Sequence, residues 1–363
     1  MKLWMPAICL CVCGLLVPSL SEARFKKYCS DCHTMHNSQN SDTMVSSTSI
    51  PYNYGSGTRQ SSLLIYSCVG CHAGTNSQTI PGKLDDDEPY VLTTAGVSYG
   101  TTGTEGNTLS GGDFSYLSSG DSKGHNVQGI ADEDLTLLRT PPGGGELASQ
   151  LKCAGTYGCH GEKGTGGIDD QAMAIHGSHH SKSTDPIDGS TVPKSYRWLL
   201  GVTGYEDSDY EYRPTSSNHN QYQGKDRSSD NNPDPNTTTI SHFCADCHGD
   251  FHNGANPDGI DGSSFSSPWI RHPVDYDMKL LTGEYASFNR PTVNAYSVAV
   301  PLASINVTVP LSMVRQTVGD SVIMCLSCHR AHGTPYDSIL RWDYKGWPTG
   351  GFNGCAICHT SKN

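Results

Sequence analysis

The chain has 363 residues, a formal net charge of −12 at pH 7, and only 17% charged and 35% hydrophobic residues. It is poor in the apolar side chains that fill an ordinary core, yet its 40 glycines and 20 prolines stay below the content of collagen-like or low-complexity chains. The acidic balance also argues against nucleic acid as a partner. Something other than apolar side chains must organise this fold.

The first 23 residues have the pattern of a secretory signal peptide. Lys2 precedes an apolar stretch over residues 3–20, and small residues form a cleavage site that ends at Ala23. The alternative, a membrane anchor, is disfavoured because the apolar run is short and contains a proline near each end. We therefore predict a signal peptide over residues 1–23 and an exported mature chain over residues 24–363, with no membrane span.

Twelve cysteines follow the predicted signal peptide, and all of them fall in pairs that end in a Cys-His step. Five pairs have the spacing Cys-x-x-Cys-His, which is the attachment pattern of c-type haem. Residues three apart share a helical face, so both thiols can bond one porphyrin while the next imidazole binds its iron. Zinc or a disulfide would explain the thiols but not the histidine. In chain order these are motif 1 (Cys29, Cys32, His33), motif 2 (Cys68, Cys71, His72), motif 4 (Cys244, Cys247, His248), motif 5 (Cys325, Cys328, His329) and motif 6 (Cys355, Cys358, His359).

The sixth pair, motif 3, consists of Cys153, Cys159 and His160 and has five residues between its thiols instead of two. A disulfide with an incidental histidine is the simpler alternative. The repeated Cys-His ending favours a widened haem motif, in which a loop with Gly155 and Gly158 bulges out and leaves both thiols near one porphyrin. We therefore predict six covalently bound haem c groups.

Ten histidines lie outside the motifs, which exceeds the six needed to close every iron with a second imidazole. His36, His252 and His332 follow a motif histidine by three or four residues, so they stand on its side and can reach only a different haem. Such an arrangement forces haem planes close together, as an electron relay requires. Nothing in the sequence indicates an iron left open for a substrate.

Little regular secondary structure is expected between the motifs. Short helices are predicted at the motif turns and over residues 133–139, whereas prolines limit residues 298–309 to short or edge strands. The polar stretch over residues 206–239 is typical of an extended surface loop, and the acidic run at 85–88 is more typical of a solvated loop than of a calcium site. We predict one domain, mostly irregular, with short helices and a few short strands organised around covalent haems.

Several longer stretches, in their order, resemble the OmcS type of filament-forming hexahaem c-type cytochromes of metal-reducing bacteria. The matching stretches include CSDCHTMHNS, KGHN, YRWLLGVTGY, FCADCHGDFHN, IRHP and CLSCHRAH, spread over most of residues 25–363. The resemblance implies a fold with little regular structure. It also implies that the distal iron ligands are His36, His125, His252, His272 and His332.

The chain departs from the family pattern after motif 3. The family has a histidine three residues beyond its third motif, and this chain has none there. His176, His179 or His180 must then supply the sixth distal ligand. His219 and His242 have no counterpart in the family and are interpreted as ordinary surface residues.

The resemblance implies a homopolymer assembled end to end, in which His36 closes the motif 5 haem of the neighbouring protomer. The alternative is that His36 ligates a haem within its own chain. The predicted function is electron conduction through stacked haems with two histidine ligands each, outside the cell, toward acceptors such as metal oxides. Other cytochromes are the expected partners, and no catalytic residues are expected. The competing functions are a non-polymeric electron shuttle and, disfavoured by the histidine supply, a multihaem reductase.

Overall fold

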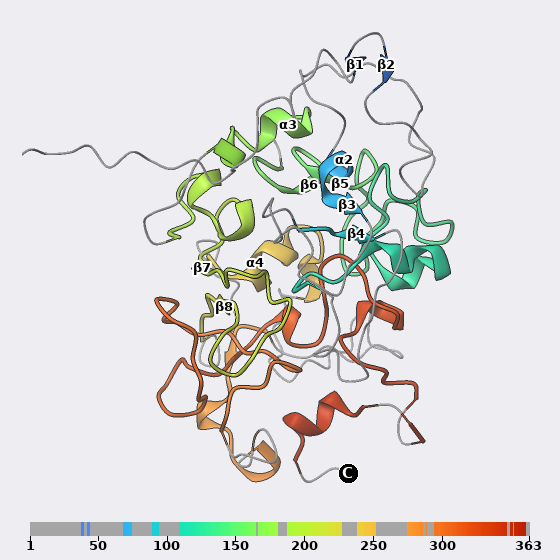
Figure 1. Ribbon diagram of the computed structural model, residues 1–363. Helices are drawn as coiled ribbons and strands as arrows, with labels where there is room; N and C mark the ends of the chain where they lie inside the picture. The colour runs from blue at the N-terminus through green and yellow to red at the C-terminus, as the bar shows by residue number, and fades with distance from the viewer. Residues whose placement is uncertain are drawn as a thin grey trace, which may run out of the picture.

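The computed structural model describes residues 38–39, 42–43, 68–74, 89–93, 109–164, 166–180, 187–226, 238–251, 274–285, 288, 294–346, 349–350 and 352–360. Across these ranges helices and strands are short, and turns and bends make up most of the chain (Figure 1). The predicted irregular fold class is confirmed. The predicted signal peptide, the acidic run at 85–88, motif 1, His36, His252 and His272 lie outside the described residues.

The helices are single turns or little more. The α-helices of the described ranges are α2 (Cys68–His72), α3 (Gln171–Ala174) and α4 (Ile240–Ala245). The 3-10 helices are η1 (Phe114–Ser119), η2 (Asp121–Lys123), η3 (Ser178–His180), η4 (Val192–Lys194), η5 (Tyr196–Trp198), η6 (Gly249–Phe251), η7 (Met278–Leu280), η8 (Gly283–Tyr285), η9 (Cys325–Ser327), η10 (Asp337–Ile339) and η11 (Gly354–Ile357).

Among the described residues the strands form two-stranded pairs and no larger sheet. Antiparallel pairs join β1 (Ser38–Gln39) to β2 (Asp42–Thr43), β7 (Gly204–Tyr205) to β8 (Gln221–Tyr222), and β9 (Tyr276–Asp277) to β10 (Val322–Ile323). Parallel pairs join β3 (Ala73–Gly74) to β4 (Leu92–Thr93) and β5 (Lys152–Ala154) to β6 (Gly158–His160). Because each pair is isolated, the strands pin neighbouring loops together and do not build a sheet-based core.

The buried apolar side chains of the described residues form four small clusters. Motif cysteines pack at the edges of all four. Cys153 packs against the cluster around Phe114, and Cys244 against the cluster around Val322. Cys358 packs against both the cluster around Met278 and the one around Trp342. The predicted haem attachment points therefore lie where the apolar side chains gather, which is where a large apolar disc would add buried surface.

The predicted helix over residues 133–139 is wrong. The segment is a turn closed by a bridge between Asp134 and Leu138. The Asp134 carboxylate accepts hydrogen bonds from the backbone of Thr136 and Leu137, both at 2.6 Å, and Leu138 adopts a left-handed φ of 53°. An aspartate that bonds its own downstream backbone offers the chain an alternative to the helix.

The predicted surface loop over residues 206–239 is also wrong for its first half. Asp207, Glu211 and Asn220 are buried, and the segment returns to pair β8 with β7. The Asn220 side chain accepts from the backbone of Asp207 at 2.8 Å, and its own backbone donates to Glu211 at 2.8 Å. The buried polar side chains of this segment form hydrogen bonds with one another and with the backbone.

Strands were also predicted within residues 298–309. The structure has only isolated bridges there, such as that between Ala303 and Val322.

Candidate haem-ligating site

The described Cys-x-x-Cys-His motifs share one local conformation. In motifs 4, 5 and 6 the histidine backbone N–H donates to the carbonyl of the first cysteine, at 3.0, 3.1 and 2.8 Å. These bonds close one helical turn, which places the two thiols on the same face. Motif 2 lies in α2, motif 4 begins in α4, and motifs 5 and 6 begin in η9 and η11. The predicted helical turns are confirmed for these four motifs.

Motif 3 places its two thiols with a different backbone conformation. Cys153 lies in β5 and Cys159 in β6, and the loop between these parallel strands turns at Gly155, whose φ is +88°. A side chain at Gly158 would begin 2.4 Å from the backbone of Ala154, so the return strand needs a glycine there. The three extra residues are thus absorbed in a tight loop, and neither thiol forms a disulfide.

The thiols of neighbouring motifs approach one another in chain order. The Cys68 thiol of motif 2 and the Cys153 thiol of motif 3 are hydrogen-bonded, which lowers the pKa of Cys68 and raises that of Cys153. A second such pair joins motifs 4 and 5, where the bond lowers the pKa of Cys325 and raises that of Cys244. Motif 3 also lies close to motif 4, and motif 5 close to motif 6, through electrostatic contacts between their thiols. Motifs 2 to 6 therefore form one continuous row.

Backbone carbonyls hold most of the motif histidines in one tautomer. A carbonyl oxygen only accepts, so a ring nitrogen facing one must carry the hydrogen, and the other nitrogen is left with its lone pair for a metal. The Nδ1 atoms of motifs 2 to 5 face carbonyls in this way: His72 to Pro89 at 2.9 Å, His160 to Arg197 at 2.8 Å, His248 to Pro142 at 2.6 Å and His329 to Ser338 at 2.7 Å. These four rings fit iron ligation through Nε2.

The histidine of motif 6 has a different neighbour. The Nδ1 atom of His359 lies 3.5 Å from the Oε2 atom of Glu284, so a carboxylate stands where the other four motifs place a carbonyl.

Three motif histidines face a histidine from elsewhere in the chain. Two metal–nitrogen bonds of about 2.0 Å and two ring radii of about 1.2 Å would separate two imidazoles on opposite faces of one metal ion by about 6.4 Å. The observed ring centroids are 6.1 Å apart for His72 and His179, 6.5 Å for His160 and His332, and 6.2 Å for His125 and His248. All three separations fit a shared iron. The structure thus brings two of the resemblance-based distal residues, His125 and His332, to motif histidines, together with His179, one of the three candidates for the sixth ligand.

Burial keeps several of these imidazoles neutral. It lowers the pKa of His125 to about 4 and that of His332 to about 3, and nearby histidines add to both shifts. Burial also lowers the pKa of His160. The neutral ring is the form that binds a metal, so these side chains are ready to do so over the physiological range.

His176 makes a different contact. Its Nε2 atom lies 2.9 Å from the Oε1 atom of Glu162, and its side chain is 43% exposed. His179 instead packs edge-on against Trp198, with ring centroids 4.4 Å apart, and faces His72. His180 ends the same helix, η3. Within this segment His179 is therefore the residue whose ring the structure places opposite a motif histidine.

The surface interpretation of His219 is wrong. His219 is fully buried and stacks on Tyr296, with ring centroids 3.7 Å apart and an angle of 6° between the planes. Its Nδ1 atom lies 2.7 Å from the Asn220 carbonyl oxygen and its Nε2 atom 3.1 Å from that of Leu311, so neither nitrogen faces a motif. His242 is half-buried in α4, two residues before motif 4. No apolar pattern predicts the burial of His219, because the residues on either side of it in the chain are polar.

His125 and His332 are held by a shared backbone. The His125 backbone donates to the His332 carbonyl at 3.2 Å, and the His125 Nδ1 atom lies 2.7 Å from the Ala331 carbonyl. The His332 backbone donates to Gly111 at 2.6 Å, and a side chain at Gly111 would begin 2.6 Å from the His332 ring. Residues 109–125 and 329–337 therefore lie side by side (Figure 1) and present two imidazoles to two different motifs.

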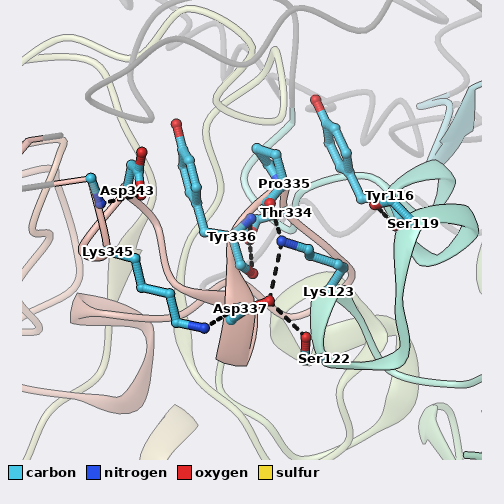
Figure 2. Close-up of polar contacts among 11 residues, drawn as sticks. Tyr116, Ser119, Ser122, Lys123, Thr334, Pro335, Tyr336, Asp337, Asp343 and Lys345 are labelled. Carbon is cyan, nitrogen blue, oxygen red and sulfur yellow. Dashed lines mark hydrogen bonds and ion pairs between the residues drawn. The ribbon is translucent and has the colours of Figure 1, made fainter. Parts of the chain in front are cut away.

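Asp337 fastens these two segments to each other. Figure 2 shows its carboxylate between Lys123, Ser122 and Lys345. The Lys123 Nζ atom lies 3.2 Å from Asp337, and Ser122 donates to it at 2.8 Å, while Lys345 forms a further ion pair. Lys123 also donates to the Pro335 carbonyl at 2.6 Å. Lys123 precedes His125 by two residues, so this contact fixes the segment that carries a candidate ligand.

We expect Asp337→Asn to weaken this junction, and to do so in a pH-dependent way. Lys345, then Ser122 and Lys123, hold the pKa of Asp337 below its usual range, so the ionised carboxylate stabilises the folded state above its unfolded pKa. That stability is lost as the pH falls through the folded pKa. The measurement is the thermal unfolding midpoint of the haem-loaded protein against pH, with a loss below about 1 kcal/mol at neutral pH because the carboxylate is a third exposed.

The matched control is Glu146→Gln, which removes an exposed carboxylate paired with Arg139 away from both segments. The control should follow the wild-type curve. Parallel loss of stability in acid for Asp337→Asn and the wild type would contradict the assigned role of Asp337.

The described residues contain neither a candidate metal cluster nor a candidate membrane span. No cluster of three or more histidine, cysteine or acidic side chains in those ranges is placed to hold a metal ion without a porphyrin. In the same ranges no helix has the length and apolar character of a membrane span.

These residues define a c-type haem site, in which paired thiols and an adjoining imidazole repeat along one chain. The profile of a family described as "Doubled CXXCH motif" matches residues 318–363, which contain motifs 5 and 6. The C-type cytochrome OmcS of Geobacter sulfurreducens is 27% identical, over 87% of this chain and 78% of the relative. The match confirms the predicted resemblance: the chain is similar to the c-type cytochrome OmcS and carries motifs for covalently bound haem c.

Two solved structures are also similar to the chain. One is described as the outer membrane cytochrome S filament from Geobacter sulfurreducens, at 21% identity and a TM-score of 0.44, covering 88% of this chain and 84% of the other. The second is described as the OmcS nanowires of the same organism, at 22% identity and a TM-score of 0.40, with the same coverage.

Proposed function

We propose that the chain is an electron-transfer cytochrome that conducts electrons through six haems, each ligated by two histidines. The observation that carries the proposal is the row of motifs 2 to 6 together with three imidazole pairs at 6.1–6.5 Å. A covalently attached haem supplies a one-electron Fe(III)/Fe(II) couple when bound. Two imidazoles on one iron leave no open position for a substrate, which favours electron relay over a reductase and leaves the protein without a catalytic residue.

The ligand set follows from the pairs. His179 would serve motif 2, His332 motif 3 and His125 motif 4, each opposite the motif's own histidine. The carbonyls facing Nδ1 orient the motif 2 to 5 rings and raise their basicity. For the other irons we propose His36, His252 and His272, on the resemblance of their sequence positions.

The ligand set joins neighbouring parts of the row. His332 follows motif 5 by three residues yet faces motif 3, and its backbone neighbour His125 faces motif 4. Two irons would thus take ligands from one double segment, which holds the haems of motifs 3 and 4 at a fixed separation. A relay needs this rigidity, because electron transfer depends on short and constant distances between centres.

We also propose that the mature protein, a single domain over residues 24–363, is exported and polymerises end to end outside the cell. The support is the match to OmcS and the description of its filaments. The haem row of one protomer would continue into the next, with His36 closing the motif 5 iron of a neighbour. Other cytochromes would supply electrons, and extracellular acceptors such as metal oxides would receive them. The second candidate function is a shuttle with the same haems and no polymer.

The decisive experiment uses protein sheared from the surface of the native cells. We expect an intact mass that exceeds the mature peptide by six haem units, an absorption spectrum with every iron low-spin, and filaments in negative-stain micrographs. A mass gain of only five haem units would show that motif 3 forms a disulfide and binds no haem. A stoichiometric high-spin signal would favour the reductase, and six low-spin haems without filaments would favour the shuttle.

A further inference from the structure

We propose that the carboxylate of Glu284 lowers the reduction potential of the haem held by motif 6, through the His359 ring. The inference rests on the proposed function in one respect, namely that His359 ligates the iron. It goes beyond that function because it gives one haem of the row a different electronic setting. The contrast that carries it is chemical: motifs 2 to 5 oppose Nδ1 with a neutral carbonyl, and motif 6 opposes it with a carboxylate.

The carboxylate is built into position by the backbone. Glu284 is the middle residue of η8, and its carbonyl accepts a hydrogen bond from the Thr360 backbone at 3.1 Å and another from the Thr360 hydroxyl. Thr360 directly follows His359, so the main chains that carry the carboxylate and the ring are tied together. The side chains of Glu284 and His359 are only 17% and 27% exposed. The 3.5 Å approach is therefore a fixed feature of the fold and is poorly screened by water.

Tyr285 packs against the His359 ring as well. Its ring lies edge-on to that of His359, with centroids 5.2 Å apart and an angle of 60°. A tyrosine phenol is neutral at physiological pH, so Tyr285 adds no second negative charge to that of Glu284.

The carboxylate acts on the iron through its charge. At 3.5 Å the contact between Oε2 and Nδ1 is electrostatic and is too long for a hydrogen bond. The negative charge stabilises Fe(III) relative to Fe(II), since the oxidised iron carries one more positive charge. The carboxylate therefore makes the one-electron reduction of this iron less favourable.

Nearby cations oppose the carboxylate and must be counted. Arg315 lies close enough to Cys358 to lower the pKa of that thiol, and its guanidinium donates to the carbonyls of Met278 and Leu281. Lys279 donates to the Arg315 carbonyl from the same side. These cations raise the potential of the motif 6 haem. They remain unchanged when only Glu284 is replaced, so a substitution of that residue isolates the contribution of the carboxylate.

The test is a spectroscopic redox titration of haem-loaded Glu284→Gln beside the wild type. Glutamine keeps the size and the acceptor oxygen but removes the charge. The titration component that corresponds to one haem should shift to a higher reduction potential, and the components of the other haems should not shift. The low-spin EPR signal of one haem should also change. The matched control is Asp169→Asn, which removes a carboxylate paired with Lys152 beside motif 3 but 73% exposed. The control titration should overlay the wild type.

Glu284→Asp keeps the charge on a shorter arm and should give a smaller shift in the same direction. It also serves if the glutamine variant does not fold. A titration of Glu284→Gln that superimposes on the wild type would overturn the inference, and so would an equal shift of every haem. His359→Gly separates the two proposals. High-spin iron in that variant, reversed by added imidazole, supports ligation by His359, whereas a wholly low-spin spectrum would refute that ligand and leave the other motifs untouched.

Discussion

Replacing His179 by alanine is expected to turn one iron per chain from low-spin to high-spin while every haem stays attached. The His179 ring lies 6.1 Å from that of His72, the separation of two imidazoles on one metal, and no thiol changes in the variant. Absorption and EPR spectra would report the spin state, and intact mass the haem count. Added imidazole should restore the low-spin form, because it can occupy the position that the side chain vacated.

His176→Ala is the matched control for this prediction. His176 lies three residues earlier in the same segment, but its ring pairs with Glu162. We expect the control to remain low-spin throughout. The assignment of His179 to motif 2 would be wrong if His176→Ala produced the high-spin iron and His179→Ala did not.

His36→Ala is expected to abolish filaments and to leave one high-spin iron per chain, with six haems attached. His36 follows the motif 1 histidine by three residues, a spacing that predicts the same side of the helical turn. As a ligand it would then bind a haem other than that of motif 1. By resemblance this is the motif 5 haem of the neighbouring protomer. A metal–ligand bond across the interface would fix the register of the subunits and would tie polymerisation to haem loading.

The control for His36→Ala is His332→Ala. His332 faces His160 within one chain, so its loss should also open one iron but should leave filaments intact. Negative-stain microscopy and spin state, measured on the same preparations, separate the two variants. Filaments of His36→Ala with one high-spin iron would show ligation without an assembly role. Normal filaments with only low-spin iron would show that His36 is not a ligand.

The attachment chemistry could be predicted from the sequence because covalent haem binding needs a fixed local pattern. The turn of motifs 4 to 6 and the glycine-dependent loop of motif 3 both follow from residues a few positions apart. The partners of the distal histidines could not be predicted in this way. Nothing near His332 indicates that it faces His160, because that contact depends on residues 109–125 folding against its backbone.

Two other failures have a common cause. Asp134 takes its downstream backbone out of the predicted helix, and Asn220 and Glu211 bury a segment that is polar in sequence. In both places hydrogen bonds between side chains and the backbone determine the structure, and the pattern of apolar residues does not predict such bonds. The same holds for the carbonyls that face the motif histidines, since any residue can supply one. Glu284 contacts His359 through its side chain, so this contact depends on the residue type. Glu284 lies 75 positions before His359, however, and the sequence does not indicate that the two residues meet.

The double segment that carries His125 and His332 has a consequence for biogenesis. A chain exported from its N-terminus presents residues 109–125 and motif 3 well before residues 329–337 emerge. Until then Gly111 has no His332 backbone to bond, and His160 faces no second imidazole. With the proposed export and ligand set, maturation of the middle of the molecule would wait for the C-terminal third, and a prematurely shortened product would keep an iron with one histidine ligand at its centre.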